Sequence, residues 1–304
     1  MLIPRQLRML IRRLFRRTTG ERSLRLAYER HYGKSLDCDD AQTFSQKVFQ
    51  RMIFLDRSGD RAFTDLTDKY LVRDYVSKRI GEKYLVKLIW QGQDPRKIPF
   101  DTLPEKCVIK TNHGSGGHLF VKGDVDRARV IDHFRKALKE NYYWRAREFQ
   151  YFNIVPRIMI EELLDDGEPM GPLDFRCWCF NGAVELIQVD NRSYSINPFY
   201  DRPWQRLDLS HREGDYPLAE IPKPGNLDEL LSVAETLSAG FDFVRVDLYN
   251  IRGRIYFGEL TFTPRAGIYS FKPESWDAAL GAKWRQGEVS RQADVPGSGV
   301  RGIF

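Results

Sequence analysis

The chain of 304 residues, 42% hydrophobic and 30% charged, is long enough to bury a core in one large or two modest domains. This composition excludes a largely disordered chain. Its four cysteines are too few and too irregularly spaced for a disulfide framework or a zinc site, so we expect them to be reduced. The 48 basic and 42 acidic residues give a modest net charge of +6, which is unevenly placed along the chain.

The first seventeen residues contain six arginines, at Arg5, Arg8, Arg12, Arg13, Arg16 and Arg17. Apolar residues recur between them at helical spacing, at Ile3, Leu7, Leu10, Ile11 and Leu14. Residues 1–18 are therefore predicted to form a basic amphipathic helix, which suits peripheral contact with the anionic inner face of the cell membrane. A helix docked on its own protein explains the pattern equally well. Because no apolar run approaches the roughly 20 residues of a membrane span, we expect a cytoplasmic protein.

Helical periodicity continues to about residue 82, and strands and helices are mixed beyond it. Strands are predicted over 84–90, 107–110, 118–122, 157–163, 175–180, 183–189, 243–249 and 254–260, and helices over 127–147 and 227–239. The fold class is therefore α+β. We divide the chain into a helical N-terminal region (1–65), a small subdomain (66–165), a second subdomain (166–285) and a mobile tail (286–304).

A glycine-rich loop follows Lys110, at the end of a predicted strand, and returns into the next strand. The loop contains His113, Gly114, Ser115, Gly116 and Gly117. Its glycines let backbone N–H groups converge on an anion, an arrangement that suits a polyphosphate. The loop is not a Walker A motif, because G-K-[ST] is absent and a strand follows it instead of a helix. A glycine-rich hairpin without a ligand is an equally common interpretation.

The strand pair at 245–261 carries two acids and an arginine. With a three-residue loop at 251–253, Asp247 and Glu259 become diagonal neighbours on one face, about 7–8 Å apart at Cα, and Arg245 stands beside them. Two carboxylates with one arginine leave a negative charge that Mg²⁺ bound to phosphate oxygens would neutralise. An ion pair without any ligand is the alternative. A two-residue loop would place Glu259 on the opposite face.

A third element is the apolar strand that ends in Glu161 and Glu162. Either carboxylate can accept a hydrogen bond from a ribose hydroxyl or an adenine amine. The alternative is that both are charged residues at the point where a strand reaches the surface.

Residues 244–264, V-R-V-D-L-Y-N-I-R-G-R-I-Y-F-G-E-L-T-F-T-P, resemble the R-x-D … G-x-x-Y-x-x-E-x-N-x-x-P signature of ATP-grasp ligases such as D-alanine:D-alanine ligase. The strings at 66–76, 103–117 and 174–182, with the hairpin through Gly267, are more closely similar to the TupA-like (teichuronopeptide biosynthesis) ATP-grasp family. The resemblance runs from about residue 40 to about residue 285. It implies an ATP-grasp fold, in which two α+β subdomains grip ATP.

The resemblance implies an ATP-dependent carboxylate–amine ligase (amidoligase). Such an enzyme joins an amino acid or amine to a uronic acid carboxylate of a cell-surface polysaccharide, such as a capsule, through an acyl-phosphate. ATP and Mg²⁺ are the implied cofactors, an acidic sugar or glycopolymer is the implied partner, and no nucleic acid is expected.

The family's functional residues carry over to this sequence by position. The resemblance implies that Lys69 and Lys110, with residues 113–117, hold phosphates, that Glu161 and Glu162 bind the nucleoside, and that Asp247, Glu259 and Thr261 hold magnesium. It also implies that Arg245 stabilises the reacting oxyanion and that Arg176 binds a phosphate or a substrate carboxylate. Thr261 stands where the signature has asparagine, which bears on whether a second magnesium binds. Arg265 either reaches the acidic substrate or pairs with a surface acid, and Arg192 and Arg206 are candidates for a further phosphate-binding base.

Two other functions compete with the ligase. A glycosyltransferase of the same pathway would need Asp165 and Asp166, or Asp190, to bind a sugar-nucleotide metal. A non-catalytic assembly protein or nucleic-acid-binding protein would use the arginine-rich N-terminus, because clustered arginine gives salt-sensitive phosphate affinity.

Overall fold

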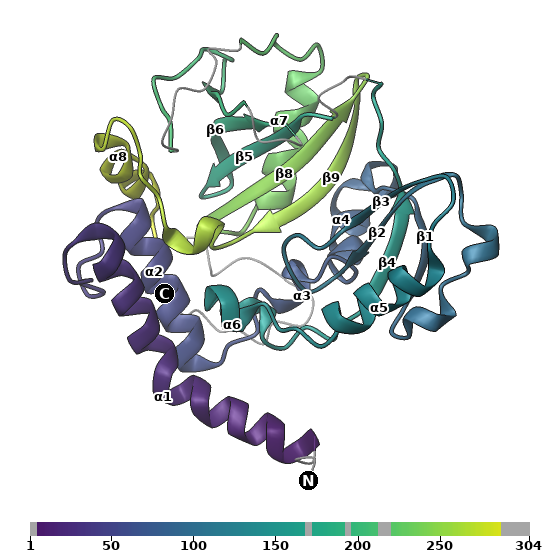
Figure 1. Ribbon diagram of the computed structural model, residues 1–304. Coiled ribbons are helices and arrows are strands. Elements are labelled where there is room, and N and C mark those ends of the chain that lie inside the picture. Colours follow the sequence, from purple (N-terminus) through teal and green to yellow (C-terminus); the bar gives the residue numbers. More distant parts are fainter. Residues whose placement is uncertain (1–4, 168–171, 192–195, 212–219, 287–304) are drawn as a thin grey trace.

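The computed structural model describes residues 5–167, 172–191, 196–211 and 220–286, with side chains from Thr19 onward. Its framework is two antiparallel sheets, with helices on their outer faces and a helical N-terminal region at one end (Figure 1). The strands of the first sheet lie within residues 66–165 and those of the second within 166–285. Arg192 and the predicted tail beyond Gln286 fall outside the described residues.

The first sheet has four strands in the order β1-β4-β2-β3. These are β1 (Leu88–Gly92), β4 (Ile158–Glu162), β2 (Lys106–Thr111) and β3 (Leu119–Lys122). Helix α5 (Arg127–Ala137) begins at an N-cap in which the Asp126 side chain accepts from Arg129 N, and it buries Val130 and Phe134 against one face of the sheet. Side chains alternate along each strand, so Lys110 and Glu161 are left on the opposite face.

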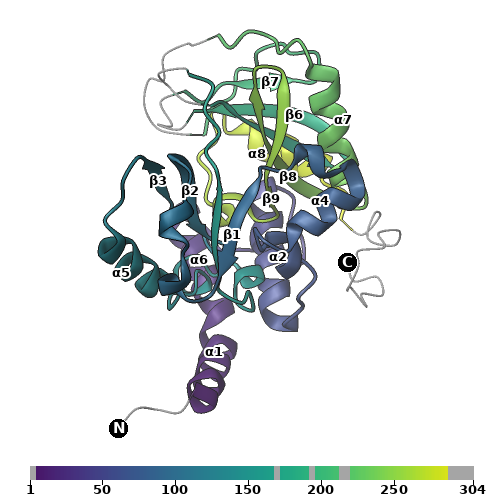
Figure 2. The ribbon, with the colours of Figure 1, turned by 90° about the vertical axis from the view of Figure 1, so that its right-hand side faces the viewer.

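The second sheet has five strands in the order β7-β6-β5-β8-β9. These are β7 (Phe199–Asp201), β6 (Ala183–Asp190), β5 (Asp174–Phe180), β8 (Phe243–Ile251) and β9 (Arg254–Thr261). Val244, Val246 and Leu248 point to one face, which α4 (Val72–Ile80) and α7 (Leu227–Ser238) cover to form the largest apolar cluster. Figure 2 shows both helices on this side of the sheet.

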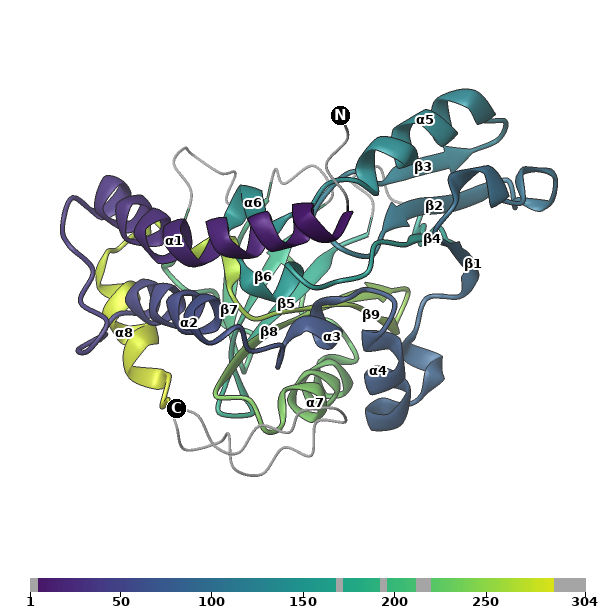
Figure 3. The ribbon, with the colours of Figure 1, turned by 90° about the horizontal axis from the view of Figure 1, so that it is seen from below.

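The other face of the second sheet is apolar at one end and polar at the other. Trp178, Phe180 and Phe243 pack beneath α1 (Arg5–Tyr32), α2 (Phe44–Ser58) and α8 (Ser275–Lys283), which lie together in Figure 3. Further along the same strands, Arg176 and Asp247 form a cross-strand pair on this face. The helices therefore close the apolar end and leave the charged end facing the first sheet.

A buried arginine connects the helical region to the strands that carry the charges. Arg51 of α2 is fully buried and donates to the carbonyls of Phe243 and Phe262, each at 3.0 Å. It also pairs with Asp242, and its guanidinium lies 4.3 Å from the ring of Trp284. Helix α2 thereby fixes the start of β8 and the end of β9 relative to each other.

Several boundaries differ from the sequence-based ones. The strand predicted at 84–90 is preceded by the 3₁₀ turn η1 (Glu82–Tyr84) and begins at Leu88. The helix predicted at 127–147 is two helices, because Asn141 accepts from Tyr143 N at 3.1 Å and so competes with helical bonding before α6 (Tyr143–Ala146). The remaining short elements are α3 (Thr64–Thr67), η2 (Pro95–Lys97), η3 (Phe100–Thr102), η4 (Phe149–Tyr151) and η5 (Pro264–Gly267). No described helix is both long enough and apolar enough to cross a membrane.

The two hairpins of the second sheet have two-residue turns. Asn181 and Gly182, with φ of 51° and 82°, make the predicted turn between β5 and β6. The three-residue loop predicted between β8 and β9 is wrong, because Ile251 pairs with Arg254 across a two-residue turn.

A bulge in β9 corrects the register that this turn would otherwise impose. Leu248 pairs with Phe257, but Asp247 pairs with Glu259, so Gly258 is the extra residue. A Cβ at Gly258 would lie 2.9 Å from the Asp247 carbonyl oxygen, which is closer than side chains normally approach. The two acids therefore face each other directly, although not by the loop geometry that the sequence predicted.

Candidate active site

A cavity of about 330 Å³ lies between the charged faces of the two sheets. Its apolar lining includes Leu85, Val86, Val108, Leu163 and Leu164. Its charged lining is formed by Lys69, Arg73, Lys110, Glu161, Glu162, Asp174, Arg176, Asp247 and Glu259. A cavity with both apolar and charged walls suits a ligand that joins a flat apolar group to charged groups.

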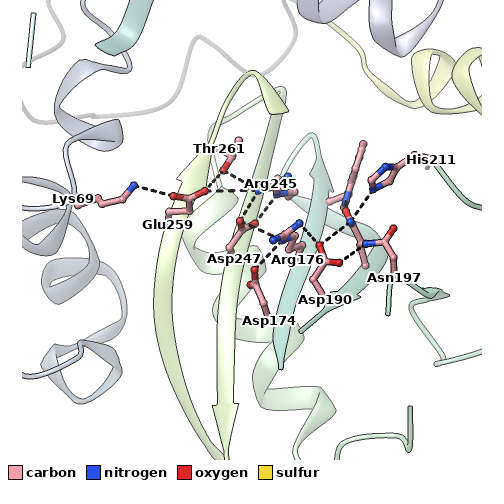
Figure 4. Close-up of polar contacts among 12 residues, drawn as sticks. Lys69, Asp174, Arg176, Asp190, Asn197, His211, Arg245, Asp247, Glu259 and Thr261 are labelled. Atoms are coloured by element: carbon pink, nitrogen blue, oxygen red, sulfur yellow. Dashed lines mark hydrogen bonds and ion pairs between the residues drawn. The ribbon is translucent and has the colours of Figure 1, made fainter. Parts of the chain in front are cut away.

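The facing acids of β8 and β9 are held by three neighbouring side chains (Figure 4). Arg245 donates to both carboxylate oxygens of Asp247, at 2.7 and 2.6 Å. Lys69 donates to Glu259 at 3.0 Å from a segment that is 190 residues away in sequence. Thr261 donates to Glu259 at 3.1 Å and accepts from Arg245 at 3.3 Å. The structure thus brings all five of these predicted residues together.

The electrostatics of this group keep Glu259 ionised. Burial acts to raise the pKa of Glu259, but the charges of Lys69 and Arg245 outweigh it and lower that pKa to about 2. Burial raises the pKa of Asp247, and the bonded Arg245 opposes this rise. Ionised oxygen donors are what Mg²⁺ binds in proteins. The opposed carboxylates of Asp247 and Glu259, with the hydroxyl of Thr261 beside them, therefore fit a magnesium ion.

The protein side chains alone do not complete a metal site. Within the described ranges, no group of three or more His, Cys, Asp or Glu side chains is placed to hold a metal ion. Mg²⁺ binds through one or two carboxylates, together with water and phosphate oxygens. A site with two acids is thus suited to an ion that arrives with a phosphate ligand.

Two cationic side chains pair with the same buried acid of the first sheet. Glu161, which is 6% exposed, pairs with Lys110 and with Arg73 of α4, the latter at 3.1 Å. Arg73 also donates to the Val86 carbonyl at 2.9 Å. Arg73 was missed in the sequence, where it is one of many arginines in a helical pattern. Glu162, at the same strand end, is more exposed and also lines the cavity.

The buried Asn112 fixes the two predicted lysines relative to each other. Its side-chain amide donates to the Asp68 carboxylate at 2.8 Å, and its backbone carbonyl accepts from the backbone N–H of Lys69 at 3.1 Å. Asn112 is also two residues after Lys110 at the end of β2. The turn between α3 and α4, which carries Lys69, is therefore bonded directly to the strand end that carries Lys110.

The glycine loop lines the cavity through Ser115 and Gly116. Gly116 and Gly117 have positive φ, 78° and 71°, a conformation that glycine adopts without strain. Gly114 packs beside the ring of Tyr142. His113 does not line the cavity, because its side chain is buried. Its Nδ1 lies 3.2 Å from the side-chain oxygen of Asn112, and burial lowers the pKa of His113.

Arg176 sits among three carboxylates rather than facing the cavity alone. It donates to Asp174 at 2.8 Å, pairs with Asp190 and lies 3.9 Å from Asp247. Asp190 is fully buried and also accepts from Asn197. Burial disfavours the charge of Arg176, but the surrounding carboxylates outweigh it and raise the pKa of Arg176. The alternation of charged residues in Asp174-Phe-Arg176 was the available sequence signal for Asp174.

Other predicted residues are not brought into this group. Arg265 is exposed, donates to the Ile268 carbonyl at 3.0 Å and lies over the ring of Tyr269. Arg206 lies in an isolated bridge with Tyr200, beyond the cavity lining. Asp165 pairs with Lys106 on the surface, and Asp190 is fully buried and pairs with Arg176.

Glu148 is a buried acid near the site that sequence reasoning missed. It is 7% exposed and accepts from Thr263, two residues after Thr261, at 2.5 Å. Burial raises the pKa of Glu148 to about 8, and the nearby charge of Glu259 contributes. No sequence signal marks this residue, which directly follows the helix predicted over 127–147.

Residues 48–285 match the family described as TupA-like ATPgrasp. None of the curated proteins matches this chain.

Solved structures of several ATP-grasp enzymes are similar to this chain. For D-alanine–D-alanine ligase from Bacillus anthracis complexed with ATP, the match is 16% identical, covers 76% of this chain and 68% of that one, and has a TM-score of 0.45. The match to the Helicobacter pylori D-alanine-D-alanine ligase is 15% identical, covers 79% of this chain and 68% of that one, and has a TM-score of 0.44. The match to the ATP-grasp ligase PsnB, complexed with minimal precursor, Mg and ADP, is 14% identical, covers 86% of this chain and 72% of that one, and has a TM-score of 0.37. Because the family match spans most of the sequence, the chain belongs to the TupA-like ATP-grasp family and has the α+β ATP-grasp fold.

Proposed function

We propose that the protein is an ATP-dependent carboxylate–amine ligase that activates its carboxylate as an acyl-phosphate. The observation that carries this proposal is the arrangement around Asp247 and Glu259. These acids face each other on one sheet, Lys69 contacts Glu259, and the cavity that both acids line also has apolar walls. A nucleotide bound in this cavity would place its phosphates between Lys110 and the acids.

In this proposal the chain contributes charge and position more than covalent chemistry. A substrate carboxylate oxygen attacks the γ-phosphorus and ADP leaves; the amine nitrogen then attacks the acyl carbon, phosphate leaves and the nitrogen loses a proton. Lys69 and Lys110 would bind the phosphates, and Arg245 would stabilise the negative oxygen of the reacting acyl group. Magnesium held by Asp247, Glu259 and Thr261 would neutralise phosphate charge. Arg176, which also pairs with the carboxylates of Asp174 and Asp190, would orient a terminal phosphate oxygen.

The proposed acid substrate is a uronic acid of a cell-surface polysaccharide, and the proposed nucleophile is an amino acid or amine. Support for this choice comes from membership of the TupA-like family. The reaction would take place in the cytoplasm, where ATP is available.

The test measures ADP and phosphate release over a panel of uronic acids and amino acids, with the product identified by mass spectrometry. Asp247→Asn and Glu259→Gln are each expected to reduce release by at least about 100-fold, because each removes a charge that the transferring phosphoryl group requires. Asp132→Asn, on the outer surface of α5, is the matched control and should change nothing. Full activity in either site variant contradicts the proposal, as does tight binding of UDP-sugars without binding of Mg-ATP.

A further inference from the structure

Helix α1 continues beyond the body on which it packs. It runs antiparallel to α2, and the two helices meet closely where a Cβ on Gly20 would lie 1.9 Å from the carboxylate of Asp56. The next residue, Glu21, pairs with Arg57 at 2.5 Å. Helix α2 ends at Ser58. Residues 5–18 therefore extend past the end of α2, for about 21 Å at the usual helical rise.

This extension, residues 5–18 of α1, projects away from both sheets in two perpendicular views (Figures 1 and 2). Docking on the chain's own body accounts for the second half of α1, where Leu24 and Tyr28 are buried. Among the residues that the structure describes, it does not account for the extension. The apolar positions of the extension therefore need a different explanation.

The extension carries the whole formal charge of the protein. Six of the 48 basic residues lie in the first seventeen, and the first acidic residue is Glu21, so the rest of the chain contains 42 residues of each sign. Several of the arginines are four positions apart and repel one another in a helix. A helix with this charge is stabilised by an external anionic partner.

The apolar positions of the extension distinguish between anionic partners. In an ideal helix with about 100° per residue, Leu7, Leu10, Ile11 and Leu14 fall within an arc of about 100°, and the six arginines occupy the rest. Binding to nucleic acid through phosphate contacts requires only the charge. A helix at a bilayer surface uses both faces, because its apolar side enters the acyl boundary while its basic side contacts lipid headgroups.

We propose that residues 5–18 form an interfacial helix that lies on a bilayer containing anionic phospholipids. This inference stands apart from the proposed ligase activity, since it uses no residue of the cavity. The extension projects away from the two sheets whose residues line the cavity (Figure 1).

The experiment is flotation of the full-length protein with vesicles of phosphatidylcholine alone or of equal parts phosphatidylcholine and phosphatidylglycerol. We expect flotation only with the mixed vesicles, and weaker flotation when salt rises from ~0.1 M to ~1 M, because the screening length falls from about 10 to about 3 Å. The double variant Arg12→Gln/Arg16→Gln should weaken partition into the mixed vesicles roughly 30-fold. Leu10→Gln/Leu14→Gln, which keeps every charge, should weaken it about 100-fold or more.

Matched controls lie on the docked half of the same helix. Arg22→Gln and Leu26→Gln change exposed residues of the same types and should leave flotation unaltered. ADP release measured without lipid should be the same in all four variants, so a failed lipid interaction is separable from a failed ligase assignment. Absence of flotation by the unmodified protein overturns the proposal. So does a leucine variant that still binds vesicles as tightly as the unmodified protein, because the extension would then bind polyanions by charge alone.

Discussion

The Gly258 bulge offers a direct test of how the chain brings its two acids together. A methyl group at this position would lie 2.9 Å from the carbonyl oxygen of Asp247 and 3.3 Å from the ring of Tyr249. The nearer atom belongs to the backbone, so it cannot move aside as a flexible side chain does. Gly258→Ala therefore requires β8 and β9 to separate by several tenths of an ångström at the residue that carries the Asp247 carboxylate.

Overpacking of this kind costs about 1–3 kcal/mol, which corresponds to a fall in melting temperature of roughly 2–5 °C for a chain of this size. A misplacement of about 1 Å costs about 100-fold in rate, so a shift of a few tenths should reduce kcat/KM for ADP release by several-fold.

The matched control is Gly225→Ala. Gly225 has nothing within 4 Å of its added Cβ and does not have a positive φ, so this variant should be unchanged or slightly stabilised. Both variants should be compared by thermal melting and by steady-state ADP release at saturating magnesium. If Gly258→Ala melts and turns over like Gly225→Ala, the bulge does not constrain the acids and the argument fails.

Three further predictions concern buried charges. Arg51→Met should destabilise the protein by about 3–5 kcal/mol in urea unfolding, because it leaves Asp242 buried without its cation; a loss below about 1 kcal/mol would contradict this. Asp190→Asn should reduce kcat/KM for ATP by about tenfold or more, because Arg176 loses a buried partner that fixes its orientation, and unchanged kinetics would show that this partner is unnecessary. The folded-state pKa of Glu148, about 8, exceeds its unfolded value, so the stability of the protein should fall as pH rises from about 4.5 to about 8. Glu148→Gln should remove that loss and be more stable than the unmodified protein by a few kcal/mol at pH ~8 but not at pH ~4.5, and equal pH slopes for the two proteins would refute the assignment.

The sequence by itself determined the features that depend on local pattern. Asn181-Gly182 favours positive φ at two successive positions, which makes the β5–β6 turn predictable from two residues. Helix α7 (Leu227–Ser238) follows from its apolar period, although Asn226 makes no side-chain cap and instead donates to the Gly253 carbonyl.

Tertiary structure decided which charges meet. Lys69 and Glu259 are 190 residues apart, and nothing in either local pattern predicts their 3.0 Å contact. The bulge at Gly258 also depended on packing, because a two-residue turn alone would have placed Glu259 in the apolar core. The burial that raises the pKa of Glu148 likewise comes from segments distant in the chain. Local sequence fixes backbone preference and side-chain period, whereas the pairing of buried charges is set by segments that only the folded chain brings into contact.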